Sequence, residues 1–169
     1  PEWITRTYDL TQGWNTVVID VTASNMLIQS LFSPVSNRIV EVRGWDSEGQ
    51  SWWRWQTCGG ALCSGVGHHG TPVAPFQVLR VNAISNACLV VQGATSPREV
   101  LLNAGWNCIA PPTFVARELA SALVGLTPSC ELVVQGTNRY DFAAGEGTSQ
   151  EIRPREALWL KMNGGLLWQ

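Results

Sequence analysis

The chain has 169 residues, of which 45% are hydrophobic and 14% are charged, and its formal net charge is −2. The charged fraction lies below the roughly 25% of an average soluble protein, which excludes a disordered chain, because disorder needs high charge and few large apolar residues. It also excludes a coiled coil, whose flanking positions are charged throughout.

The eleven basic residues, ten Arg and the single Lys161, are scattered along the chain. This distribution predicts no nucleic-acid partner and no attraction to an anionic membrane. No apolar run approaches the roughly 18 residues of a membrane span, so membrane insertion is not expected. The first six residues do not resemble a signal peptide, but a chain that begins with Pro1 is compatible with trimming, so a location outside the cytoplasm stays open.

An internal repeat is the strongest signal in the sequence. Gly13-Trp14-Asn15 recurs as Gly105-Trp106-Asn107. At the same offset, further matches pair Leu27 with Leu119, Leu31 with Leu123, Val40 with Leu132, Val42 with Val134 and Gly44 with Gly136. After length changes, Pro75–Asn82 aligns with Pro154–Lys161, and Leu89–Gln92 with Leu166–Gln169. We therefore predict two copies, residues 1–95 and 96–169, that together form one compact domain, with a loop at 58–72 inserted in the first copy.

In chain order, the first copy predicts a buried strand, a short helix and then a series of strands. Ser24 is the expected cap of the helix, and Pro34 follows its end. A turn at Asp46–Gly49 joins two of the strands. The expected strands are Asn15–Val21, Arg38–Trp45, Gln50–Gln56, Val78–Asn82 and Cys88–Gln92.

The second copy repeats this order. Thr113 is the expected helix cap, and Gly125 with Pro128 ends the helix. Its expected strands are Glu131–Gly136, Ala157–Met162 and Leu166–Gln169. The predicted fold class is mainly β (α+β): two tandem strand-helix-strand-hairpin units that pack with pseudo-twofold symmetry, because each is too small to cover its own apolar face.

The repeat resembles the GWN-type repeat modules of secreted and cell-surface bacterial proteins. The matching residues are Leu102, Gly105, Trp106, Asn107, Ile109, Pro111 and the closing segment Pro154–Met162. The resemblance implies surface display and a stalk or adhesion architecture, and it implies no enzyme chemistry. We interpret Trp14 and Trp106 as structural, since Gly permits a positive φ, Trp supplies a large contact and Asn bonds its own backbone.

The candidate binding surface is a Trp-rich segment. It consists of Trp45, Trp52, Trp53, Arg54 and Trp55. On a strand, Trp53 and Trp55 point one way and Trp52 and Arg54 the other, so each face carries an aromatic side chain. Three interpretations stay open: packing in the core, a surface for a protein partner or for self-association, and a platform for sugar rings.

The inserted loop of the first copy holds Cys58, Cys63, His68 and His69. Two Cys and two His suffice for a tetrahedral zinc site, but adjacent His side chains diverge, so a Cys58–Cys63 disulfide is the alternative. Cys108 and Cys130 flank one predicted strand-helix-strand unit, and Cys88 is the fifth cysteine. One or two disulfides, or five small apolar core residues, are both consistent with this pattern.

Catalytic motifs are missing from the sequence. No G-x-S-x-G segment occurs, and Gly145-Glu146-Gly147-Thr148 lacks the Lys of a phosphate loop. We therefore expect a non-enzymatic binding or adhesion module without a cofactor, located extracellularly or on a cell surface, with a protein or carbohydrate partner. The alternatives are a self-assembling virion or surface-layer component and a small zinc- or thiol-dependent enzyme.

Overall fold

The computed structural model describes residues 2–58, 61–63, 72–96, 99–113, 115–147 and 151–169. Strands make up 55% of it and helices 10%, so the predicted mainly β class is confirmed. The chain divides into two compact units. Unit 1 is Pro1–Gly44 with Trp52–Pro97, and unit 2 is Trp45–Ser51 with Arg98–Gln169. No helix among the described residues is long and apolar enough to cross a bilayer.

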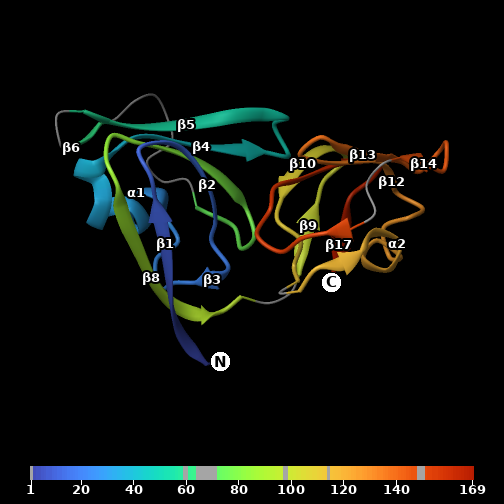
Figure 1. The fold of residues 1–169 in the computed structure, drawn as a ribbon, viewed down its shortest axis with the longest axis horizontal. Helices are drawn as coiled ribbons and strands as arrows, with labels where there is room; N and C mark the ends of the chain where they lie inside the picture. The colour runs from blue at the N-terminus through green and yellow to red at the C-terminus, as the bar shows by residue number, and fades with distance from the viewer. Residues whose placement is uncertain (1, 59–60, 64–71, 97–98, 114, 148–150) are drawn as a thin grey trace. The chain divides into compact units, whose positions relative to one another are not determined.

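Unit 1 contains two antiparallel sheets, with strand orders β1-β8-β3 and β2-β7-β4-β5-β6 (Figure 1). Its strands are β1 (Trp3–Leu10), β2 (Gly13–Val18), β3 (Val21–Thr22), β4 (Ile39–Asp46), β5 (Ser51–Cys58), β6 (Ala61–Cys63), β7 (Val78–Ala83) and β8 (Ala87–Thr95). Apolar residues alternate along these strands and form one buried cluster that includes Leu79, Val81 and Leu89, each fully buried.

Unit 2 contains one five-stranded and two two-stranded sheets among its described residues, with orders β10-β16-β12-β13-β14, β17-β9 and β11-β15. Its strands are β9 (Val100–Leu102), β10 (Gly105–Ile109), β11 (Arg117–Glu118), β12 (Cys130–Gln135), β13 (Asn138–Asp141), β14 (Glu146–Gly147), β15 (Glu151–Ile152), β16 (Leu158–Met162) and β17 (Leu166–Trp168). Leu102, Val133 and Leu160 are fully buried in its interior.

The helices are shorter than predicted, and both expected caps are wrong. Helix α1 spans Ile28–Phe32 with Leu27 at its N-cap, so Ser24 lies outside it. A 3₁₀ helix, η1 (Ser33–Arg38), follows directly. Pro34 therefore lies at the start of the 3₁₀ helix, where a missing N–H is tolerated.

The second helix also begins later than its expected cap. Helix α2 spans Leu119–Ala122 and has Glu118 at its N-cap, without a side-chain cap bond. The Thr113 hydroxyl instead donates to the Val115 carbonyl at 2.8 Å. Leu119 and Leu123 are buried, as the apolar pattern predicted.

The two Gly-Trp-Asn segments have the same local structure. Gly13 and Gly105 have φ of 97° and 88°, a region that favours glycine. Each begins the edge strand of its sheet, and the next strand, β7 or β16, pairs antiparallel with it: Gly13 lies opposite Ala83, and Gly105 lies opposite Met162.

The Asn side chain closes each of these turns. Asn15 Oδ1 accepts the Thr11 N–H at 2.9 Å, and its Nδ2 donates to the carbonyls of Thr11 at 2.8 Å and Gly13 at 2.9 Å. Asn107 makes the equivalent bonds to Asn103 N at 2.9 Å, Asn103 O at 2.8 Å and Gly105 O at 3.2 Å. We call each of these turns an Asn clamp.

We expect Asn107→Ala to lower the free energy of unfolding by about 2 kcal/mol, because Asn107 is 1% exposed and its loss leaves the Asn103 backbone groups without partners. Urea unfolding followed by tryptophan fluorescence measures the change. Asn163→Ala is the matched control at an exposed position and should stay within about 0.5 kcal/mol of the wild type. Equal losses in the two variants would contradict the role of the clamp.

Candidate functional site

The Trp-rich strand β5 divides its side chains between the core and the surface. Trp53 is 5% exposed and Trp55 is 1% exposed, and both belong to the core cluster of unit 1. The binding prediction is therefore wrong for these two residues. Trp52 is 46% exposed, and Arg54 lies on the same outer face. Gly44 is needed here because a Cβ at this position would overlap the Trp53 ring.

Trp45 belongs to unit 2, where it forms an aromatic cluster with Trp106 and Trp159. The Trp45 and Trp159 ring centroids are 5.3 Å apart at 70°, and those of Trp106 and Trp159 are 6.2 Å apart at 80°. These edge-to-face arrangements are favourable for aromatic pairs. Trp45 Nε1 donates to the Trp106 carbonyl at 2.7 Å. Trp45 is thus half-buried and holds the fold, which corrects its predicted place in an open binding surface.

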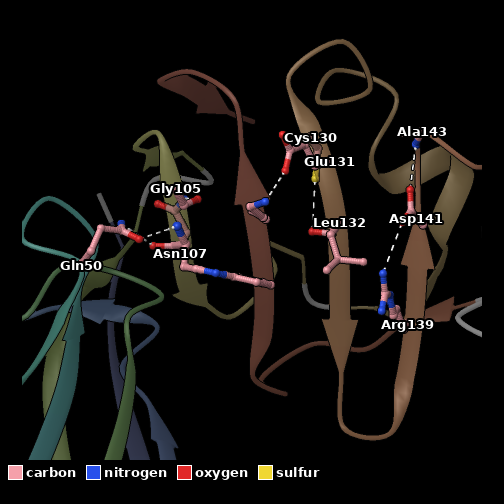
Figure 2. Close-up of polar contacts among 11 residues, drawn as sticks. Gln50, Gly105, Asn107, Cys130, Glu131, Leu132, Arg139, Asp141 and Ala143 are labelled. Atoms are coloured by element: carbon pink, nitrogen blue, oxygen red, sulfur yellow. Dashed lines mark hydrogen bonds and ion pairs between the residues drawn. The ribbon is translucent and has the colours of Figure 1, made fainter.

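Trp45 belongs to the tip of the β4–β5 hairpin, Trp45–Ser51. The same tip contains Gln50, whose side-chain amide covers the edge of β10. Gln50 Oε1 accepts the Trp106 N–H at 2.7 Å, and Gln50 Nε2 donates to the Trp106 carbonyl at 3.0 Å; Figure 2 shows this side chain beside Gly105. The amide thereby pairs with both outward backbone groups of Trp106. A side chain that does this protects a sheet edge in the way that a further strand would.

The other polar contacts in Figure 2 close turns and hold strands of unit 2. The Asp141 carboxylate accepts the N–H groups of Ala143 and Ala144, and the bond from Ala144 is the main reason that the pKa of Asp141 lies below its usual value. Lys161 Nζ lies 2.7 Å from a Glu131 carboxylate oxygen. These charged groups therefore have structural partners.

A groove on the outer face of unit 1 is the candidate binding site. It has a volume of about 340 Å³ and is lined by Trp14, Arg43, Trp52 and Arg80. These residues come from β2, β4, β5 and β7, four neighbouring strands of one sheet. Arg43 and Arg80 lie directly opposite each other in the pairing of β4 with β7.

The alternation of buried and exposed residues creates this groove. On β7, Leu79 and Val81 point into the core, so Arg80 points outward. On β4, Val42 and Gly44 are buried on either side of Arg43. Trp14 at the sheet edge is 45% exposed. The groove therefore combines two exposed indole rings with two guanidinium groups.

The electrostatics of the groove favour a negative ligand. The Arg43 and Arg80 guanidinium carbons lie 5.0 Å and 5.8 Å from the Trp14 ring centroid, within the range of cation–π attraction. Glu41, which is 6% exposed, forms an ion pair with Arg43, and this bond raises the pKa of Arg43 above its usual value. Arg80 has no ion pair within the described ranges, so its charge is available to a ligand.

Sequence reasoning missed three of the four lining residues. The sequence pattern indicates a structural role for Trp14 and does not distinguish Arg43 and Arg80 from the other arginines. The apolar neighbours of each Arg signal that it points outward, but the pairing that brings Arg43 beside Arg80 depends on a bulge between Ile39 and Glu41. The sequence pattern contains no sign of that bulge.

The predicted metal and disulfide positions are described in part. The side chains of Cys58 and Cys63 and the whole of His68 and His69 lie outside the described residues. Among the described residues, no group of three or more His, Cys, Asp or Glu could hold a metal ion. Cys88, Cys108 and Cys130 are thiols, so no disulfide joins Cys108 to Cys130; these two lie on β10 and β12, with β16 between their strands.

Comparison with known proteins gives no relative. No family model, no curated protein and no solved structure matches this chain. The class of protein therefore has to be inferred from the groove and the two units themselves.

We expect Cys130 to resist alkylation by iodoacetamide at pH 8, whereas Cys88 reacts. Burial raises the pKa of Cys130 to about 11, so its thiolate is scarce at this pH, while Cys88 is exposed. Peptide mapping by mass spectrometry of the native protein compares the two labelling rates. Labelling of Cys130 at the rate of Cys88 would show that the strand carrying Cys130 opens readily.

Proposed function

We propose that this chain is a non-enzymatic binding or adhesion module, displayed outside the cytoplasm, and that it binds its partner in the groove of Trp14, Arg43, Trp52 and Arg80. The observation that carries the proposal is the exposure of two large indole rings beside Arg80, which forms no ion pair with any residue that the structure describes. Tryptophan and arginine are the residues that contribute most binding energy at interfaces. The resemblance to GWN-type repeats supports display on a surface.

We further infer that the chain consists of two copies of one unit. The Asn clamps have matching bonds, and the strand pairings of the two units correspond. Leu10 pairs with Ala87 in unit 1 as Leu102 pairs with Leu166 in unit 2. A bulge lies between Ile39 and Glu41 of β4, and one lies between Cys130 and Leu132 of β12.

Alignment on these pairings shows how the groove of unit 1 differs from the equivalent positions of unit 2. Arg80 corresponds to Trp159, and Arg43 corresponds to Val134, since each pair occupies equivalent positions beside β7 or β16. The position that is aromatic in unit 2 is therefore cationic in unit 1. Because an apolar residue fits this position in unit 2, the fold does not require a charge there. The charged Arg80 in unit 1 therefore supports a role in binding.

We expect Trp52→Ala and Arg80→Gln each to weaken binding of the module to its ligand by tenfold or more, a cost of at least about 1.4 kcal/mol. An array of acidic and neutral glycans and of acidic and neutral peptides, probed with labelled wild-type protein, identifies the ligand class. Titration calorimetry then measures the affinities of the variants.

Trp3→Ala is the matched control, because Trp3 is 64% exposed but lies on β1 in the other sheet of unit 1. Its affinity should equal that of the wild type. A ligand whose binding responds equally to all three variants, or a wild type that binds nothing on the array, would refute the proposal. Light scattering of the same sample should show a monomer; a concentration-dependent polymer would favour the self-assembling alternative.

A further inference from the structure

In unit 2 the hairpin tip Trp45–Ser51 packs against the edge of β10. The tip lies against Gly105–Trp106. Gln50 Nε2 and Trp45 Nε1 donate to the Trp106 carbonyl, and Gln50 Oε1 accepts the Trp106 N–H. Asn103 Nδ2 also donates to Ser47 Oγ at 2.8 Å, and Gln50 Nε2 to the Ala104 carbonyl at 3.5 Å. Three of these bonds reach the backbone of Trp106. The edge of β10 next to the Asn clamp is thus bound by the carboxamide of Gln50 and the indole of Trp45.

The corresponding edge of unit 1 has the same backbone but an open surface. A Cβ at Gly105 would lie 2.7 Å from Gln50 Oε1, whereas a Cβ at Gly13 would meet nothing within 4 Å. Trp106 directs its N–H and carbonyl groups away from β16, toward Gln50. Because β2 pairs with β7 in the register in which β10 pairs with β16, Trp14 directs the same two groups away from β7.

The charges of the tip and of the groove are complementary. The tip carries Asp46 and Glu48 and has no basic residue. The groove beside the Gly13–Trp14 edge carries Arg43 and Arg80, and Glu41 offsets only the first of them. Opposite charges of this kind give specificity and rapid association.

We infer that the Gly13–Trp14 edge and the adjoining groove bind an acidic peptide segment of a partner protein, with a carboxamide on the outward backbone groups of Trp14 and an indole over the groove. This inference rests on the proposed function and names its ligand class. An acidic peptide is favoured over a nucleic acid because the basic residues outside this face are scattered and the net charge is −2. The tip of the same chain shows how a carboxamide and an indole bind the equivalent edge of unit 2.

The probe for this inference is a cyclic peptide with the sequence Trp45–Ser51, added to uniformly ¹⁵N-labelled wild-type protein. We expect saturable shifts of the Gly13, Trp14 and Arg80 amide signals. Gly105 and Trp106 should not shift, because the tethered tip competes there at an effective concentration of roughly millimolar. Peptides that carry Gln50→Leu, or Asp46→Asn with Glu48→Gln, should bind about tenfold more weakly.

Protein variants complete the test. Trp14→Ala and Arg80→Gln should each raise the dissociation constant of the peptide about tenfold, whereas Trp3→Ala and Arg117→Gln should leave it unchanged. Both control residues are exposed and lie on other sheets. Circular dichroism confirms that each variant is folded.

Several results would overturn the inference: no shift at Gly13 and Trp14 with millimolar peptide, shifts at Gly105 and Trp106 alone, or equal binding of the neutral peptide. An oligogalacturonate and a single-stranded oligonucleotide are added in parallel. If either of these binds the groove and the peptide does not, the ligand class is wrong while the proposed function stands. If Trp52→Ala and Arg80→Gln change the binding of no ligand, the proposed function falls as well.

Discussion

The Asn clamp is the interaction on which the rest of this structure depends. In each unit, one carboxamide bonds the N–H and the carbonyl of the residue four positions before it, and it also bonds the carbonyl of the glycine two positions before it. The glycine adopts a positive φ that other residues rarely reach. The clamp therefore fixes where the edge strand begins and which face receives the tryptophan.

The edge strand that follows the Asn clamp has a different surface in each unit. In unit 2 the clamped edge is covered: Gln50 pairs with the backbone of Trp106, and Trp45 packs edge-on against Trp159. In unit 1 the clamped edge is exposed, and Arg80 stands where unit 2 has an aromatic ring. The aromatic cluster packs within unit 2, whereas the equivalent face of unit 1 exposes the guanidinium groups of Arg43 and Arg80 beside Trp14. The same Gly-Trp-Asn turn thus lies beside an aromatic cluster in one unit and beside two guanidinium groups in the other.

Several strands were predictable from the sequence, because apolar alternation follows directly from burial. The strands before the two Asn clamps, β1 and β9, were not predicted, and the strand expected at Asn15–Val21 is divided between β2 and β3. The strand predicted at Val78–Asn82 is β7 with one more residue, and the strand predicted at Arg38–Trp45 is β4 shifted by one. The helices were less predictable. Ser24 and Thr113 are good capping residues, but α1 and α2 are a single turn or little more, and packing of their apolar residues sets their limits more than capping does.

Neither the correct alignment of the two units nor the set of residues that line the groove could be derived from the sequence alone. A constant offset in the sequence pairs Val42 with Val134, whereas the strand pairings match Val42 with Val133. Val42 and Val133 are both fully buried. The strand pairings likewise match Leu89 with Trp168 instead of Leu166. Cross-strand neighbours such as Arg43 and Arg80 depend on this register. The sequence therefore indicated Trp52 as a candidate binding residue but not the residues that lie beside it.

Amide hydrogen exchange at Thr11 and Asn103 tests the clamp most directly. Both N–H groups donate to an Asn Oδ1 at 2.9 Å, so both should be protected in the wild type. Asn15→Ala should remove protection at Thr11 alone, and Asn107→Ala should remove it at Asn103 alone. Exchange of both amides at the rate of an unstructured peptide in the wild type would contradict the account.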